Sequence, residues 1–128
     1  MVAIQDGARP FATWQLIDRV VRAANTYSAA APAISVKDTI KVVKGGVVIN
    51  TPDRKTLMAV QTPQVFDLAL LKAALLKAET DGAEVTDDCS AVELMGMSVK
   101  IVEGDERNIK ITTPMDLKIA KLIMEDMA

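Results

Sequence analysis

Residues 36–64 read VKDTIKVVKGGVVINTPDRKTLMAVQTPQ, and this stretch decides how the chain is organised. Two strand-like runs, Thr39–Lys44 and Val47–Asn50, flank the pair Gly45-Gly46. Paired glycines supply the positive φ angles that a tight primed hairpin turn requires. An isolated two-stranded hairpin is marginal in water. We therefore expect residues 37–54 to form a β-hairpin arm that lies on its own domain or reaches a second chain.

The composition is typical of one globular domain, residues 1–128. Half of the residues (50%) are hydrophobic and 25% are charged, which suits a packed core rather than a disordered chain. The formal net charge of -2 argues against a nucleic-acid surface, and no apolar run is long enough to span a bilayer. A single cysteine cannot form an internal disulfide, which is typical of the cytoplasm. We expect neither a nucleic-acid nor a membrane partner.

Strand-like and helical segments alternate along the chain. Strands are expected at Met1–Gln5, Ala29–Val36, Leu57–Gln61 and Val99–Glu103, and Pro32 places the second at an edge or a bulge. Four helices are expected: the first is capped by Thr13 and runs from Trp14 to about Tyr27, and the second runs from about Val65 to Ala78. The third has Thr86 as its cap and ends at Gly96. The fourth begins after Thr113-Pro114, and its inward-facing residues are expected to be Leu117, Ala120, Ile123 and Met124. This alternation predicts an α/β layered fold with a mostly parallel sheet.

Polar residues follow the predicted strands. Asp6, Arg9 and Lys110 fall directly after strands or in the loops that follow them. Ligands of such sheets bind beyond the carboxyl ends of the strands, so we expect these three side chains on one rim. Arg54 and then Thr62-Pro63-Gln64 follow the hairpin, and their polar groups are suited to holding an oxyanion. The six glycines form neither a G-x-G pattern nor a P-loop, so this chain shows no phosphate-cradling turn of its own.

Several motifs in order carry a family resemblance. QDGARPF, VKDTIK, TPDR, QTPQ, EVTDDCS and VEGDERNIKITTP are similar to the C-terminal half of 2-C-methyl-D-erythritol 4-phosphate cytidylyltransferases. These enzymes of non-mevalonate isoprenoid synthesis join CTP to a sugar-alcohol phosphate and release pyrophosphate. The resemblance covers essentially the whole chain and implies an incomplete Rossmann-like fold of the nucleotide-diphospho-sugar transferase type. It also implies that the N-terminal half, which binds CTP in the family, is missing.

The resemblance implies roles for seven residues. Arg54 and Lys110 would be the catalytic pair that holds methylerythritol phosphate for in-line attack on the α-phosphorus of CTP. The hairpin arm would cross to a second subunit, so Arg54 would act in the partner's site of a homodimer. Mg²⁺ would be bound mainly through the nucleotide phosphates, and no residue of this chain would be a metal ligand. The residues that would bind the substrate are Asp6, Arg9, Thr39, Thr62 and Thr86.

Other interpretations stay open. The chain could be a non-catalytic dimerisation module from a truncated gene, or part of a ribitol-phosphate cytidylyltransferase, and a plant-type source would place it in the plastid stroma. By itself we expect it to have negligible activity. Thr86 could serve only as a helix cap, and Asp87 and Asp88 complement a helix dipole better than they suggest a metal site. Cys89 is expected to be a buried small hydrophobe and not a nucleophile.

Overall fold

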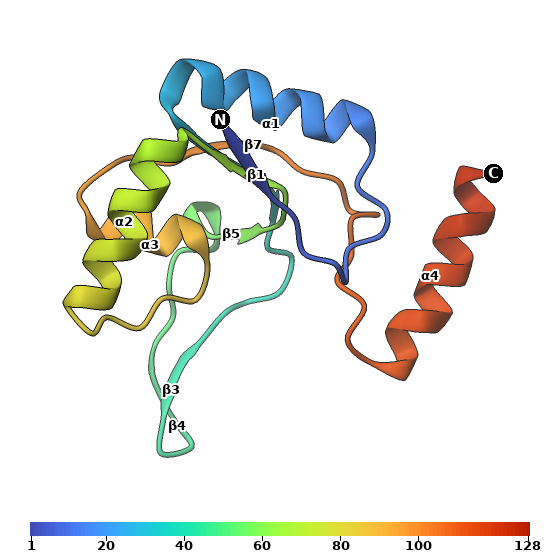
Figure 1. Ribbon diagram of the computed structural model, residues 1–128. Coiled ribbons are helices and arrows are strands. Elements are labelled where there is room, and N and C mark those ends of the chain that lie inside the picture. The colour runs from blue at the N-terminus through green and yellow to red at the C-terminus, as the bar shows by residue number, and fades with distance from the viewer.

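A computed structural model describes residues 1–128 and contains a five-stranded sheet, four α-helices and a separate two-stranded hairpin (Figure 1). None of its helices has both the length and the apolar content needed to cross a membrane. The elements in chain order are β1 (Val2–Ile4), α1 (Trp14–Tyr27), β2 (Ala29–Ser35), β3 (Val42–Lys44), β4 (Val47–Asn50), the short 3₁₀ helix η1 (Arg54–Thr56), β5 (Met58–Val60), β6 (Gln64–Phe66), α2 (Leu68–Thr80), α3 (Asp88–Leu94), β7 (Lys100–Glu103) and α4 (Pro114–Met127).

Strand β2 is the centre of the sheet. It pairs in parallel with β7 on one side and antiparallel with β5 and β6 on the other, and β1 pairs antiparallel with β6. Strands β1, β2 and β7 therefore run in one direction, while β5 and β6 run in the opposite direction. The α/β fold is confirmed, and the direction shared by three strands matches the predicted sheet. Strands β5 and β6 return from the arm directly beside β2, which antiparallel neighbours can do without a crossover helix.

The two faces of the sheet are covered by different helices. Side chains of a strand alternate between the faces, and Ala29, Ala31 and Phe66 pack with the buried residues of α2 and α3. Ala30 and Val65 point to the opposite face and pack against α1. The layers are thus α1, the sheet, and α2 with α3, as Figure 1 shows. This arrangement leaves the loops at the carboxyl ends of β1, β2 and β7 free to form a rim.

Pro32 lies in the central strand, so the predicted edge position is wrong, and no register shift marks a bulge within β2; the irregularity lies in its partner. Segment Gln61–Pro63 separates β5 from β6, and the N–H of Gln61 donates to the carbonyl of Pro32 at 2.8 Å. The nitrogen and carbonyl of one strand residue point to the same side, so the missing N–H of Pro32 faces this interruption. The central strand therefore tolerates a proline because its partner leaves the ladder there.

Two predicted helix starts are wrong. The helix expected from Val65 begins at Leu68, because Gln64–Phe66 joins the sheet and Asp67 Oδ1 accepts the N–H of Leu70 at 3.0 Å. The cap of α3 is Asp87 and not Thr86, since Asp87 Oδ1 accepts the N–H of Ser90 at 2.8 Å. The caps at Thr13 and Thr113 are confirmed, and the second forms a capping box with Asp116.

The last helix packs differently from the prediction. Of the four residues expected to face inward, only Ala120 is buried, whereas Leu117 is 56% and Met124 62% exposed. Helix α4 extends away from the sheet in Figure 1 and meets the loop at Pro10 and Phe11 through an apolar groove. Its amphipathic pattern is therefore not used against the sheet of this chain.

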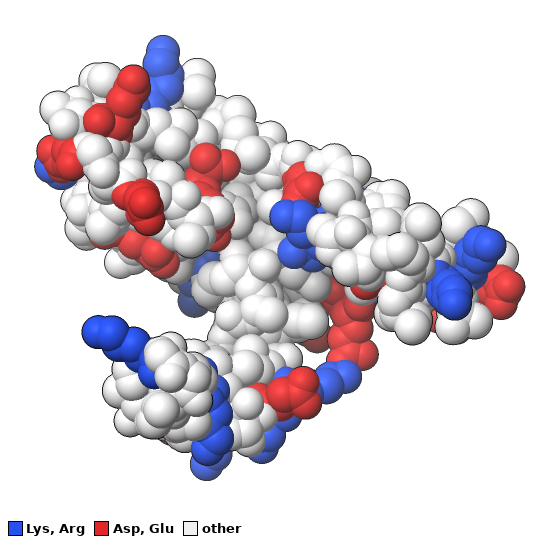
Figure 2. All heavy atoms as spheres, turned by 90° about the horizontal axis from the view of Figure 1, so that it is seen from below, with Lys and Arg blue, Asp and Glu red and all other residues white.

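The hairpin arm is confirmed as a structural element. Gly45 and Gly46 have φ angles of 58° and 76°, the pair of positive values that a primed turn needs. Strands β3 and β4 pair only with each other, and their valine and isoleucine side chains are exposed. Viewed from below, the arm is a separate lobe with basic side chains along it (Figure 2). The arm does not fold back on the sheet, and its reach to a second chain stays a prediction.

The loop after β7 crosses close to β2 at Gly104. The N–H of Gly104 donates to the carbonyl of Ala33 at 2.9 Å. A Cβ at position 104 would lie 2.6 Å from Oε1 of Gln61 and 3.0 Å from both the carbonyl carbon and oxygen of Ala33. Because the Ala33 atoms belong to the backbone of the central strand, only glycine fits at this crossing.

We predict that Gly104→Ala lowers the free energy of unfolding by about 1–3 kcal/mol, the range typical of overpacking. Gly7→Ala is the matched control, because a Cβ there meets nothing within 4 Å and its φ is not positive. The control should change stability by no more than about 0.5 kcal/mol. Urea denaturation of both variants measures the difference, and equal midpoints would show that the Gly104 crossing is not tight.

Candidate active site at the rim of the sheet

Two predicted site residues from opposite ends of the chain meet at the rim. Lys110 Nζ lies 3.1 Å from Asp6 Oδ2, with Lys110 half exposed and Asp6 mostly covered. Asp6 directly follows the strand region of β1, and Lys110 lies in the loop after β7. The other carboxylate oxygen of Asp6 accepts the N–H of Ala8 at 3.0 Å, which fixes the carboxylate while Lys110 remains accessible.

Two further predicted residues join this pair. The Thr62 hydroxyl accepts the backbone N–H of Asp6 at 3.1 Å. Arg9 donates its backbone N–H to the Asp6 carbonyl at 3.1 Å, and its Nη1 donates to the carbonyl of Asn108 at 2.6 Å. We call Asp6, Arg9, Thr62 and Lys110 the rim cluster. Three separate loops thus converge on one place, as the topology of the sheet predicts.

The rim cluster carries one carboxylate and two cations. The N–H of Ala8 and then the ammonium of Lys110 lower the pKa of Asp6 below its usual range, so Asp6 is ionised at neutral pH. Burial lowers the pKa of Arg9, opposed by the charge of Asp6, but an arginine starts so high that it stays protonated. The net charge of the cluster is therefore positive, which favours binding of an anion. If that anion also carries hydroxyl groups, they can donate hydrogen bonds to the carboxylate.

Three predicted residues lie outside the rim cluster. Arg54 Nη1 donates to the carbonyl of Lys37 at 2.7 Å, at the base of the arm. The Thr86 hydroxyl is 3.1 Å from the Ser90 hydroxyl beside the start of α3. Thr39 is exposed in the arm. No hydrogen bond or ion pair joins any of the three to the rim cluster, so their predicted roles are not assembled within one chain.

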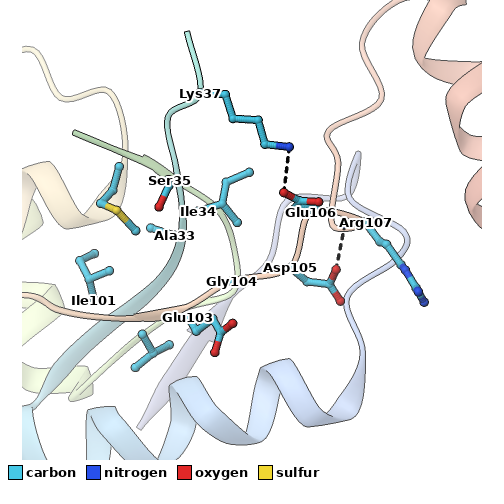
Figure 3. Close-up of a pocket in the computed structure, with 12 residues that line it drawn as sticks. Ala33, Ile34, Ser35, Lys37, Ile101, Glu103, Gly104, Asp105, Glu106 and Arg107 are labelled. Atoms are coloured by element: carbon cyan, nitrogen blue, oxygen red, sulfur yellow. Dashed lines mark hydrogen bonds and ion pairs between the residues drawn. The ribbon is translucent and has the colours of Figure 1, made fainter. Parts of the chain in front are cut away.

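A cleft of about 780 Å³ opens at the carboxyl ends of β2 and β7 (Figure 3). It is crossed by the ion pair of Lys37 and Glu106 at 2.9 Å. None of the seven predicted site residues lines this cleft, but its floor includes the start of the loop that continues to Lys110. The lining residues are Ala33, Ile34, Ser35, Lys37, Met58, Ile101, Val102, Glu103, Gly104, Asp105, Glu106 and Arg107.

Sequence reasoning missed the burial of three amide side chains near the rim cluster, and Gln64, expected to help hold an oxyanion, is one of them: Gln61, Gln64 and Asn108. Gln64 donates from Nε2 to Asp87 at 3.1 Å and accepts the N–H of Cys89 at 3.2 Å, which ties β6 to the start of α3. The available signal was the pair of glutamines in QTPQ, which stand between strand-like apolar residues where a surface glutamine is not expected.

The carboxylates of the chain do not gather into a metal site. Asp87 accepts both the N–H and the hydroxyl of Ser90, at 2.8 and 2.6 Å, and thus serves the start of α3. Nowhere in residues 1–128 do three Asp, Glu or Cys side chains come together as metal ligands. The Mg²⁺ that the resemblance implies therefore has no set of three carboxylate or thiolate ligands in this chain.

Solved structures that share this arrangement include 2-C-methyl-D-erythritol 4-phosphate cytidylyltransferases. The 2-C-methyl-D-erythritol 4-phosphate cytidylyltransferase from Thermus thermophilus superposes with a TM-score of 0.86 at 39% sequence identity, covering 96% of this chain and 61% of that one. The 4-diphosphocytidyl-2C-methyl-D-erythritol synthase from Anaerococcus prevotii gives a TM-score of 0.89 at 35% identity, covering 97% and 56%. The fold is therefore that of these nucleotidyltransferases.

The chain belongs to the 2-C-methyl-D-erythritol 4-phosphate cytidylyltransferase family, whose model matches residues 1–126. Relatives with this name include those of Caldanaerobacter subterraneus subsp. tengcongensis, 51% identical over 125 residues, and Bacillus velezensis, 53% identical over 126 residues. The matches cover 97% and 98% of this chain but 55% and 54% of the relatives. The resemblance is confirmed, and the chain spans about half the length of these relatives.

We predict that the Cys89 thiol is inert in the folded chain. Cys89 is buried, and burial together with the charges of Asp87, Glu93 and Asp88 raises its pKa to about 12. A thiol-specific reagent such as Ellman's should therefore release almost no product at mildly alkaline pH and one equivalent after guanidinium unfolding. Rapid reaction of the folded chain would show that Cys89 is accessible or activated.

We predict that Asp6 contributes to acid sensitivity. Its pKa is lowered by folding, so its stabilising contribution is complete above the unfolded value of about 4 and is lost as the pH falls through the lowered value. Unfolding free energy measured against pH should fall less steeply in Asp6→Asn than in the wild type below about pH 4. Asp116, lowered by the N–H of Thr112 and the hydroxyl of Thr113, contributes in the same window and remains in this variant. Parallel curves for wild type and Asp6→Asn would contradict the assignment.

Proposed function

We propose that this chain is the part of a cytidylyltransferase that binds 2-C-methyl-D-erythritol 4-phosphate, in an enzyme that joins this substrate to CTP and releases pyrophosphate. The family match over residues 1–126 supports the reaction class. The observation that carries the substrate role is the convergence of Asp6, Arg9 and Lys110, which offers two cations and one carboxylate at one rim. A phosphate bound to a polyol has the complementary groups, an anion and hydroxyl donors.

The residues of the rim cluster suit a reaction that needs positioning more than proton transfer. A phosphate monoester has a second pKa of about 6, so its oxygen is already a nucleophile at neutral pH and needs no general base. The chain has no histidine to supply one. The requirement that remains is to hold the anionic nucleophile in line and neutralise its charge. The half-exposed ammonium of Lys110 can contact a phosphate oxygen while the Asp6 carboxylate accepts a substrate hydroxyl.

Arg54 would complete the site from a second copy of the chain. Its guanidinium uses one nitrogen to donate to Lys37 at the base of the arm, and the remaining N–H groups can grip two phosphate oxygens. The exposed apolar side chains of β3 and β4 support a homodimer through the arm, because a lone hairpin gains stability when this surface is covered. Thr39 and Thr86 would add hydroxyls to the same assembled site.

The CTP site is proposed to lie in the part of the relatives that this chain does not span. The support is the coverage of the matched relatives and the absence of a phosphate-cradling glycine pattern in this sequence. Mg²⁺ would be held by the phosphates of the nucleotide, since the chain gathers no carboxylate cage. The single buried cysteine supports a reducing compartment such as the cytoplasm.

Titration of the chain with 2-C-methyl-D-erythritol 4-phosphate by isothermal calorimetry tests this proposal. We expect measurable binding, weakened about tenfold or more in Lys110→Ala, because a charge-assisted hydrogen bond contributes about 1.5–3 kcal/mol. Lys118→Ala is the matched control, since this exposed lysine of α4 lies outside the rim cluster and should leave the Kd unchanged. Arg54→Ala should weaken binding only under conditions in which chromatography shows a dimer.

Three results would overturn the proposal. A chain that dimerises but binds no methylerythritol phosphate would be a non-catalytic module. Tighter binding of ribitol 5-phosphate would favour the ribitol-phosphate enzymes. Pyrophosphate release from CTP, Mg²⁺ and methylerythritol phosphate at the rate of a complete enzyme would place the CTP site within these 128 residues.

A further inference from the structure

The rim cluster is held together largely by groups that would not themselves touch a substrate. Its three loops come from after β1, from between β5 and β6, and from after β7. Apart from the Asp6–Lys110 ion pair, the contacts that tie the last loop to the other two run mainly through Gln61 and Asn108. These side chains are 4% and 0% exposed. Gln61 finds partners for both its amide donor and its amide acceptor, and the buried amide donor of Asn108 has two acceptors, so these bonds specify where the neighbouring loops lie.

The Gln61 side chain makes two hydrogen bonds to the backbone at the start of the loop that follows β7. Its Nε2 donates to the carbonyl of Asp105 at 2.8 Å, and its Oε1 accepts the N–H of the same residue at 3.2 Å. This pair of bonds imitates one rung of an antiparallel ladder at a point where the strand itself is interrupted. These two bonds require the loop after β7 to pass close to Gln61 at Gly104, where a Cβ would lie 2.6 Å from Oε1 of Gln61.

Asn108 links the three loops to one another. Its Nδ2 donates to the carbonyl of Thr62 at 2.9 Å and to Oε1 of Gln61 at 3.3 Å. The backbone carbonyl of Asn108 accepts a hydrogen bond from Nη1 of Arg9 at 2.6 Å. Lys110 follows two residues later, and the N–H of Ile111 donates to the carbonyl of Ala8 at 2.8 Å. The position of Lys110 opposite Asp6 is therefore bounded on both sides by bonds to the other loops.

We propose that Asn108, seated by Gln61, is a positioning residue that holds Lys110 at the Asp6 carboxylate. Without its side chain, the carbonyl of Thr62 loses its donor, and the loop that carries Lys110 keeps its attachment to the segment between β5 and β6 only at Asp105, five residues before Lys110. Lys110 then samples positions away from Asp6, because its own flexible side chain and half-exposed ion pair cannot fix the loop. The consequence for substrate binding rests on the proposed function, whereas the effect on Asp6 does not.

The first experiment needs no ligand. The carboxyl carbon of Asp6 is followed by NMR against pH in the wild type, in Asn108→Ala and in Gln61→Ala. The groups that set this titration are Ala8, Lys110 and Arg9, and Thr62 contacts the backbone of Asp6. We expect both variants to move the midpoint upward towards the ordinary aspartate value, because the charge of Lys110 leaves while the bond from Ala8 remains. An unchanged midpoint in Asn108→Ala would overturn the proposal.

Two controls separate positioning from loss of fold. Asn25→Ala removes an exposed asparagine of α1 and should leave the Asp6 titration unchanged. Protection of the Cys89 thiol reports whether the core beside α3 stays folded in each variant. If Asn108→Ala does not fold, Asn108→Ser keeps a small hydrogen-bonding group and gives the same test: its midpoint must lie between those of the wild type and Lys110→Ala, and a value equal to the wild type would overturn the proposal.

The second experiment uses 2-C-methyl-D-erythritol 4-phosphate as the probe in a double-mutant cycle. Asn108→Ala should weaken binding about tenfold in the wild-type background, as the loss of an outer partner of a binding side chain typically does. In the Lys110→Ala background it should have little further effect, because its action passes through Lys110. Equal loss in both backgrounds would identify a merely structural role. If the wild type does not bind, the proposed function fails, and the Asp6 titration still decides the positioning role.

Discussion

The interruption between β5 and β6 is the constraint on which the rim of this molecule depends. An unbroken strand would place Gln61, Thr62 and Pro63 alternately under the helices on either face of the sheet. Because the strand leaves the ladder there, the Gln61 side chain reaches Asp105 and the Thr62 hydroxyl reaches the backbone of Asp6. The facing residue of the central strand is Pro32, which has no N–H to leave unsatisfied. The sheet therefore opens its edge to two loops at little cost in hydrogen bonds.

The division between scaffold and site follows from this opening. Helices α1, α2 and α3 cover both faces of the sheet with apolar side chains, so the sheet is fixed independently of the rim. The rim residues are loop residues, and loops acquire a defined geometry only through bonds to a rigid element. Here the rigid element is the strand pair β2 and β6, and buried amides bond to backbone and side-chain groups that the loops bring inward.

Local chemistry allowed most of the fold to be predicted. The caps at Thr13 and Thr113 and the turn at Gly45-Gly46 depend on a few neighbouring residues, and all three are present. The meeting of Asp6 with Lys110 could be predicted because strands that share a direction end at the same edge. The start of α2 could not be predicted, since Val65 fits both the period of the helix and a buried strand, and only the pairing with β2 decides between them.

The buried amides could not be predicted from the sequence for a different reason. A glutamine or asparagine is usually a surface residue, and the burial of Asn108 becomes visible only when its partners from distant loops are in place. The outward face of α4 was mispredicted through the opposite error, because an apolar stripe shows that a helix needs a partner and does not say which one.

The charge of the rim also explains why the arm matters to the proposed function. Asp6 offsets one of the two cations of the rim cluster, so one chain offers a single net positive charge to a substrate phosphate that carries close to two negative charges. Arg54 is the cation that would restore the balance, yet it is bonded to Lys37 at the base of an arm that points away from its own sheet. In the proposed dimer the same arginine would come from the second copy, so the proposed site would need the second chain for its charge balance.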